Sequence, residues 1–302
     1  MTAPRPRSTR DVLCIGSVLW DVIGRSRDTL RIGSDMPGRI SRIPGGVAMN
    51  IAMTLRRFDM TPILLSAVGR DPEGEELLAA SVRLGIETSY VYRSEELPTD
   101  RYMAIEDANG VVAALADAHS LEAAGANILA PLRDGRLGSE GQPYSGLVAL
   151  DGNLTEALLA EIAESPLFTA TDLRVAPASP GKAKRLRPLL GCPRGVLYVN
   201  LEEAGLLAGQ RFSSAAEAGT TLVDNGATRV IVSDGGRTAA DCTRDRVTTA
   251  TPPKVQVARV TGAGDTLMAA HIAAETEGQD PQMALECALA AAASYVSGDV
   301  LA

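Results

Sequence analysis

A short glycine-containing turn near the carboxyl end of the chain places an aspartate at the start of a helix-forming segment. The turn reads Val-Thr-Gly-Ala-Gly-Asp over residues 260–265, and the apolar run 266–270 follows without a break. The first N–H groups of a helix have no acceptor within the helix and lie at the positive end of its dipole, so they can hold a phosphate. Because Asp265 would otherwise repel phosphate, we interpret it as the acceptor of a proton from an attacking hydroxyl. The spacing therefore predicts a phosphoryl-transfer site.

Further polar residues follow predicted strands, where open α/β sheets bind their ligands. Asp21 lies just past the first predicted strand, 11–16, and Asp151 and Asn153 follow a later one, 146–150. These side chains could hold sugar hydroxyls. Ordinary turn chemistry explains the same positions equally well.

The dipeptide Gly45-Gly46 precedes a predicted helix at 48–58 that carries Asn50 in its first turn. Adjacent glycines let a backbone approach a ligand closely, and the Asn50 amide offers both a donor and an acceptor to a hydroxyl. A plain turn is the alternative explanation of the glycines. The pair alone does not decide between them.

Two more strand ends carry candidate groups. Asn200 and Glu203 lie one helical turn apart and can face the same water or metal ion, although a helix cap with a first-turn glutamate explains the spacing equally well. Ser233, Gly235 and Gly236 end a further strand in a loop of small residues, which could admit a nucleotide or merely turn the chain.

The elements that must position these residues alternate between strand and helix. This order predicts an α/β fold with a mostly parallel central sheet flanked by helices on both faces. Two exposed β segments, at about 22–43 and 99–117, are predicted to form a separate small sheet, with a tight turn at Asn109-Gly110. No internal repeat or second folding unit is evident, so residues 1–302 are interpreted as one domain. Predicted strands are 11–16, 62–68, 146–150, 170–175, 195–199 and 229–233, and predicted helices are 48–58, 73–84, 155–163, 201–207, 214–225 and those that start at 263 and 281, with Asp71 and Pro72 at the start of the second.

Composition argues against several classes of protein. A net charge of −8 disfavours nucleic-acid binding, and the longest basic cluster, 182–185, is interpreted as a solvated helix face. No apolar stretch reaches the roughly 20 residues of a membrane span, and no secretory signal is evident, so a cytoplasmic protein is expected. The four scattered cysteines are predicted to be buried thiols, and two histidines make a zinc site unexpected. A first-strand Gly-x-Gly-x-x-Gly is absent, which disfavours a dinucleotide-dependent dehydrogenase.

Taken in order, these motifs resemble those of the PfkB, or ribokinase-like, carbohydrate kinases, and the resemblance covers nearly the whole chain. It implies a ribokinase-like α/β domain with a small β-sheet lid that uses ATP and Mg²⁺. It also implies that Asp265 is the base and that the backbone of residues 262–264 stabilises the transferring phosphoryl group. The implied site residues are Gly262, Ala263, Gly264 and Asp265 for catalysis, Asn200, Glu203, Ser233, Gly235, Gly236 and Thr261 for nucleotide and metal, with Glu203 at the metal, and Asp21, Gly45, Gly46, Asn50, Asp151 and Asn153 for the acceptor.

Several stretches are most similar to the branch of this family that phosphorylates pseudouridine, among them 36–40, 99–102 and 151–154. The resemblance implies the 5′-hydroxyl of this C-glycosidic nucleoside as the acceptor. Tyr102, Asp117 and His119 are the expected partners of the base, and strand packing explains Tyr102 about as well. A kinase for ribose, a purine nucleoside or another furanose is the alternative. A non-catalytic sugar- or nucleotide-binding protein is the alternative of a different class, and the intact Gly-Ala-Gly-Asp turn argues against it.

The chain departs from the general family pattern at two informative positions. Val47 stands where ribokinases carry a lysine, which disfavours free ribose. Arg259 stands six residues before Asp265, where many members have an aspartate that helps to bind a monovalent cation. We expect its guanidinium to replace the charge of K⁺. A homodimer that covers the exposed lid strands is also expected.

Overall fold

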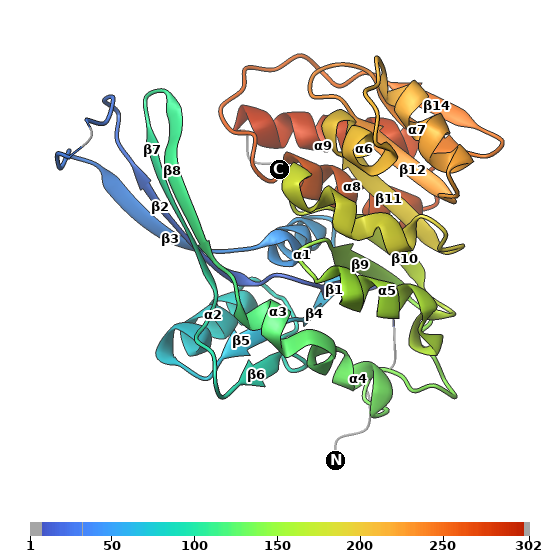
Figure 1. Ribbon diagram of the computed structural model, residues 1–302, viewed down its shortest axis with the longest axis horizontal. Coiled ribbons are helices and arrows are strands. Elements are labelled where there is room, and N and C mark those ends of the chain that lie inside the picture. Colours follow the sequence, from blue (N-terminus) through green and yellow to red (C-terminus); the bar gives the residue numbers. More distant parts are fainter. Residues whose placement is uncertain (1–7, 32, 299–302) are drawn as a thin grey trace.

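An eight-stranded sheet forms the centre of the computed structural model, which describes residues 8–31 and 33–298 (Figure 1). The six strands from β12 to β4 are parallel, whereas β13 and β14 continue the sheet in antiparallel fashion. The parallel strands are apolar runs because helices cover both of their faces. Their order is β14 (Val247–Ala250), β13 (Ala239–Thr243), β12 (Arg229–Ser233), β11 (Gly195–Asn200), β10 (Asp172–Ala176), β9 (Leu147–Asp151), β1 (Asp11–Ile15) and β4 (Thr61–Leu65).

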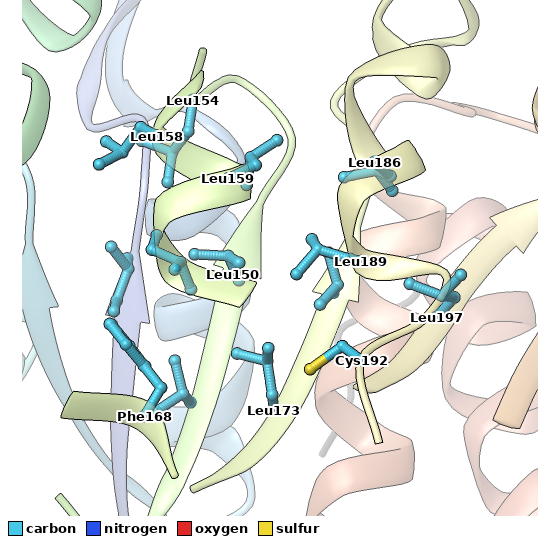
Figure 2. Packing of buried hydrophobic residues seen from close by; sticks show 14 of the residues in the cluster. Leu150, Leu154, Leu158, Leu159, Phe168, Leu173, Leu186, Leu189, Cys192 and Leu197 are labelled. Carbon is cyan, nitrogen blue, oxygen red and sulfur yellow. The ribbon is translucent and has the colours of Figure 1, made fainter. Parts of the chain in front are cut away.

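Two hydrophobic clusters fill the two sides of this sheet. In Figure 2, leucines of α5 and η3 pack against Leu150, Leu173 and Leu197 from neighbouring strands. Burying a leucine side chain of this kind contributes about 1.5–3 kcal/mol, so the layers hold each other in place. One cluster draws on α5 (Glu156–Glu164), η3 (Pro180–Leu189), α6 (Leu201–Ala208) and α7 (Ala215–Asp224), and the other on α1 (Val47–Arg57), α2 (Pro72–Arg83), α8 (Ala263–Thr276) and α9 (Pro281–Ser297).

A second sheet of four strands, which we call the lid, projects from the main body (Figure 1). It contains the two segments that the sequence predicted as exposed strands. Its register places Asp21 beside Tyr102 on one face and Val22 beside Met103 on the other, because successive side chains of a strand alternate. The strand order is β3 (Arg39–Gly45), β2 (Leu19–Arg25), β7 (Arg101–Asp107) and β8 (Gly110–Asp117).

Some predicted elements differ from the structure. The predicted strand 62–68 is divided between β4 and β5 (Ala67–Gly69), which pairs with β6 (Tyr92–Ser94) in a separate two-stranded sheet. The strands β13 and β14 were not predicted, since Asp241 interrupts the short apolar pattern of β13 and two threonines form the middle of β14. By contrast, Asp71 caps α2 through the Gly74 N–H and Pro72 opens the helix, as predicted. Short helical segments complete the chain: α3 (Ser120–Ala124), η1 (Gly125–Leu129), α4 (Ala130–Arg133) and η2 (Pro166–Phe168).

The cysteine prediction is wrong at one position. Cys14, Cys192 and Cys242 are buried, but Cys287 is exposed because it lies on the outer side of α9. Throughout residues 8–31 and 33–298, no helix is long and apolar enough to span a membrane.

Candidate active site

Asp265 lies in the first turn of α8, at the carboxyl edge of the central sheet. The helix is preceded by Gly262 at φ 89°, where a β-carbon would lie 2.6 Å from Tyr295 Oη, so glycine is required for this turn. Among the described residues, the N–H groups of Gly264 and Asp265 have no hydrogen-bond acceptor. The turn thus offers unpaired donors at a helix start, as an anion site needs.

The Asp265 carboxylate is partly buried and accepts one side-chain hydrogen bond, from Asn50 Nδ2 at 3.0 Å. Burial raises the pKa of Asp265 to about 7, the Asn50 hydrogen bond opposes this shift, and the nearby carboxylates of Asp151, Glu203 and Asp21 add to it. A carboxylate with a pKa near neutrality is well matched to accept a proton.

The two predicted glycines before α1 make room for neighbouring groups. A β-carbon at Gly45 would overlap the Asp21 carboxylate, and one at Gly46 would lie 2.5 Å from the carbonyl oxygen of Ser17. Gly46 also has a φ of 94°, which side-chain-bearing residues rarely adopt. The glycines therefore bring Asp21 and the start of α1 together, close to Asp265. Burial raises the pKa of Asp21 to about 6.

The lid residues are divided between its two faces. Tyr102 lies beside Asp21, and burial, followed by the Asp21 charge, raises the pKa of its hydroxyl. Asp117 pairs with Arg101, so its side chain lies on the opposite face from Tyr102. His119 is exposed, with its Nε2 4.0 Å from Asp117 Oδ1. The structure brings Tyr102 to Asp21 and leaves Asp117 and His119 apart from them.

Asp151 and Asn153 face into the protein. Asp151 is wholly buried and accepts hydrogen bonds from Ser17 and Asn153. The prediction that 182–185 is a solvated face is wrong for two of its residues. Lys182 Nζ donates to Asn153 Oδ1 at 2.5 Å, and Arg185 Nη1 donates to the Asn153 carbonyl oxygen at 2.9 Å. Their long side chains reach inward to the β9 loop.

Asn200 and Glu203 form a capping box at the start of α6. Asn200 Oδ1 accepts from the Glu203 N–H at 2.9 Å, and Glu203 Oε2 accepts from the Asn200 N–H at 2.8 Å. The helix-cap interpretation is confirmed, and the metal role stays a prediction. Burial raises the pKa of Glu203, whose charge also raises that of Asp265. Two carboxylates that disfavour each other's charge suit a bound cation such as Mg²⁺, although no cluster of three metal-binding side chains occurs within the described ranges.

Ser233 lies next to Asn200 in the register of β12 and β11. Beyond it, β-carbons built at Gly235 and Gly236 would meet no atom within 4 Å, so this loop borders open space. Asp234, which lies between Ser233 and Gly235, pairs with Arg237 at 2.6 Å. The predicted nucleotide loop and the capping box thus lie side by side, at the carboxyl ends of the neighbouring strands β12 and β11.

Arg259 binds the end of α9 beneath the glycine turn. Its Nε donates to the Tyr295 carbonyl oxygen at 2.8 Å, and its guanidinium lies 3.8 Å from the centre of the Tyr295 ring. Tyr295 Oη in turn donates to the Thr261 carbonyl oxygen at 2.9 Å. Sequence reasoning missed Tyr295 and Ser17, which no local pattern distinguishes from ordinary helix and turn residues.

Comparison with known proteins gives consistent matches. The family model described as pfkB family carbohydrate kinase matches residues 9–298. A pseudouridine kinase of Escherichia coli (strain K12) is 31% identical over 271 residues, which cover 85% of this chain and 81% of the relative. The uncharacterized sugar kinase YeiI of the same organism is 31% identical over 69% of this chain and 55% of the relative.

Solved structures agree on the architecture. A carbohydrate kinase from Agrobacterium tumefaciens is 26% identical with a TM-score of 0.80, covering 96% of this chain and 94% of that one. Arabidopsis thaliana ribokinase, complexed with ribose and ATP, is 20% identical with a TM-score of 0.75, covering 97% and 93%. The predicted α/β fold with a central sheet and a smaller second sheet is confirmed.

Proposed function

Because the chain belongs to the pfkB family of carbohydrate kinases, we propose that it transfers the γ-phosphoryl group of ATP to the 5′-hydroxyl of pseudouridine. The predicted family is confirmed, and the chain is an ATP-dependent kinase of a sugar or nucleoside. The observation that carries the catalytic part of the proposal is the Asp265 carboxylate, poised by Asn50 at the open start of α8. Similarity to a pseudouridine kinase over most of both chains supports the acceptor.

In the proposed reaction, Asp265 takes the proton of the acceptor hydroxyl while the hydroxyl oxygen bonds to the γ-phosphorus. The bond from that phosphorus to the β,γ-bridging oxygen breaks, and ADP leaves with the electron pair. The unpaired N–H groups of Gly264 and Asp265 stabilise negative charge on the phosphoryl oxygens. Glu203 and Asn200 would hold Mg²⁺, directly or through water; bound there, the ion would neutralise phosphate charge.

The lid face that carries Asp21 and Tyr102 supports a nucleoside as acceptor. Asp21 can accept from sugar hydroxyls, and Tyr102 offers a ring and a hydroxyl to a base. Val47 leaves an apolar position where ribokinases have an ammonium group. An ADP-release assay with pseudouridine, uridine, adenosine, ribose and fructose tests this. We expect the highest kcat/KM with pseudouridine, and preferential phosphorylation of a free sugar would contradict the nucleoside assignment.

We also propose that Arg259 takes the place of a monovalent cation. Its guanidinium lies against the Tyr295 ring and carbonyl oxygen, and Tyr295 contacts the turn that contains Thr261. A fixed positive charge at this point supports the anion-binding turn without K⁺. Equal rates in potassium salts and in salts of a bulky organic cation are expected. Strong activation by K⁺ would contradict this role.

The outer face of the lid supports a homodimer. Met103, Ile105 and Leu115 share this face with Ile40, and Ile40 and Leu115 are 78% and 71% exposed. A second copy of the lid would cover these side chains and the free strand edges. Light scattering should give the mass of a dimer for the native chain and of a monomer for Leu115→Glu. A monomeric native chain at micromolar concentration would rule the dimer out.

A further inference from the structure

We propose that Asp151 is a positioning residue for phosphoryl transfer, which fixes Ser17 and the start of α1 and so holds Asn50 against Asp265. The inference rests on the proposed role of Asp265 as the base. It assigns Asp151 a place in the active site that differs from contact with the acceptor. Hydrogen bonds join Asp151, at the end of β9, to Ser17 and Ser17 to the start of α1, and Asn50 of this helix binds the reacting carboxylate.

The Asp151 carboxylate is enclosed by donors from the protein itself. Its Oδ2 accepts from Ser17 N at 2.8 Å, Ser17 Oγ at 2.6 Å and Asn153 Nδ2 at 3.1 Å, and its Oδ1 accepts from Asn153 N at 2.8 Å. The residue has an exposed fraction of 0%, and a β-carbon at Gly16 would overlap it. Because the carboxylate is wholly buried, a sugar hydroxyl could reach it only if the groups around it moved.

Ser17 replaces the missing cap of α1. The residue before this helix is Gly46, which has no side chain to bind the first N–H groups. Ser17 Oγ accepts from Val47 N at 2.9 Å, and the Ser17 carbonyl oxygen accepts from Met49 N at 3.3 Å. The start of α1 is therefore docked on a serine that Asp151 holds in place.

Asn50 links the start of α1 to the Asp265 carboxylate. It lies in the first turn of α1, where its N–H donates to the Gly46 carbonyl oxygen at 2.8 Å, and its Nδ2 reaches Asp265 Oδ2 at 3.0 Å. In the described part of the chain, no other side chain forms a hydrogen bond to the Asp265 carboxylate. A displacement of about 1 Å in a catalytic group can lower the rate about 100-fold, so the position of the first turn of α1 should affect turnover.

Two cationic side chains hold Asn153, which in turn binds Asp151 and Ser17. Lys182 Nζ donates to Asn153 Oδ1, and Asn153 Nδ2 donates to Ser17 Oγ at 2.9 Å as well as to Asp151. Arg185 Nη1 donates to the Asn153 carbonyl oxygen and pairs with Glu122 Oε1 at 2.8 Å. An unpaired buried carboxylate would be strongly destabilising, so these donors are what allows Asp151 to be buried.

The test compares Asp151→Asn with Ser17→Ala, using ATP and pseudouridine. The asparagine keeps the shape of the side chain but turns an NH₂ group toward donors, and the alanine removes the hydroxyl from both Asp151 and Val47 N. We expect each variant to lower kcat about 10- to 100-fold, with KM for ATP and acceptor changed less than about threefold. Asp134→Asn is the control, because Asp134 is exposed and, among the residues that the structure describes, its side chain bonds only to Arg136 in its own turn. It should keep the native kcat.

Two further readouts separate positioning from a general loss of structure. The Asn50 hydrogen bond lowers the pKa of Asp265, so displacing Asn50 in Ser17→Ala should move the acid limb of kcat/KM to higher pH. Asp151→Asn also removes a charge that raises this pKa, so its acid limb should lie at lower pH than that of Ser17→Ala. The double variant should lose no more kcat than the more damaging single variant, because both changes break one chain of contacts.

Several results would overturn the proposal. A raised KM for the acceptor with native kcat would make Asp151 a substrate contact. A lower melting temperature with native kcat and pH profile would leave it only a structural role, and losses that add in the double variant would show independent actions. If Asp151→Asn does not fold, native kcat in Ser17→Ala contradicts the proposal by itself. If the native enzyme does not phosphorylate pseudouridine, the proposed acceptor is wrong, and the same comparison is made with whichever of uridine, adenosine or ribose it phosphorylates.

Discussion

The two ends of α8 carry carboxylates in opposite electrostatic surroundings, about 15 Å apart along the helix. Asp265, at the start, faces other carboxylates and has a pKa raised to about 7, chiefly by burial. Glu275, at the end, is also largely buried, and burial opposes its charge. Arg174, His271 and Arg229 outweigh that cost and lower its pKa to about 2. One helix thus holds one carboxylate ready to accept a proton and another that stays ionised.

The difference lies in the partners that the sheet supplies. At its amino edge, Arg229 Nη1 donates to Glu275 Oε1 at 2.7 Å and Arg174 pairs with Oε2, while Arg229 also pairs with the buried Asp241. At the carboxyl edge the described residues place no cation against Asp265, whose side chain is held by a neutral amide. The ionic end fixes the helix in the fold, and the unpaired end is left for chemistry.

The largest effect is expected from Asp265→Asn. The amide cannot take the proton of the acceptor, and loss of a general base lowers kcat by about 100- to 10,000-fold. Calorimetry with a non-hydrolysable ATP analogue should give nearly native affinity, because the backbone donors of the turn are kept. Turnover within about threefold of native would mean that another group is the base.

At the other end of α8, Glu275→Gln should act on stability. Removing the charge leaves Arg174 and Arg229 without their shared partner, at a cost of about 3 kcal/mol in the free energy of unfolding. Urea unfolding measures this change, and kcat of the remaining folded enzyme should stay close to native.

The control for this variant is Glu277→Gln, an exposed glutamate just past the same helix. Because the pKa of Glu275 is lowered on folding, its stabilisation is complete above about pH 4.5 and is lost as the pH falls toward 2. The deficit of Glu275→Gln should therefore shrink over that range. An equal deficit at every pH would show that lost packing, not lost charge, is responsible.

A smaller and opposite effect on stability is expected for Asp265→Asn. Because the pKa of Asp265 is raised on folding, the ionised carboxylate destabilises the native state as the pH rises from about 4 through 7. The amide should increase the free energy of unfolding by about 2 kcal/mol near pH 8 and leave it unchanged near pH 4. Thermal unfolding at the two pH values checks this, and a destabilised variant at pH 8 would contradict the charge argument.

Features that depend on neighbours in sequence were predictable. The parallel strands are apolar runs, and Asp71 and Pro72 are a local signal for the start of α2. The glycines of the Gly-Ala-Gly-Asp sequence likewise indicate a tight turn at the start of α8. The spacing of Asn200 and Glu203 predicted the capping box for the same reason.

Features that join distant segments were not predictable from one sequence. Ser17 caps a helix that begins 30 residues later, and it meets Asp151 across 134 residues. Nothing local in Asp151 distinguishes a buried carboxylate from a ligand contact at a strand end. The antiparallel strand β13 escaped prediction because Asp241 interrupts its apolar pattern, although this residue is wholly buried against Arg229.

The pH dependence of kcat/KM for the native enzyme tests the central claim most directly. If Asp265 is the base and its environment raises its pKa as described, activity falls on the acid side with a midpoint near pH 7. The midpoint should be the same with different nucleoside acceptors, because it belongs to the enzyme. An acid limb near pH 4, the ordinary range for an aspartate, would contradict the account of the two ends of α8.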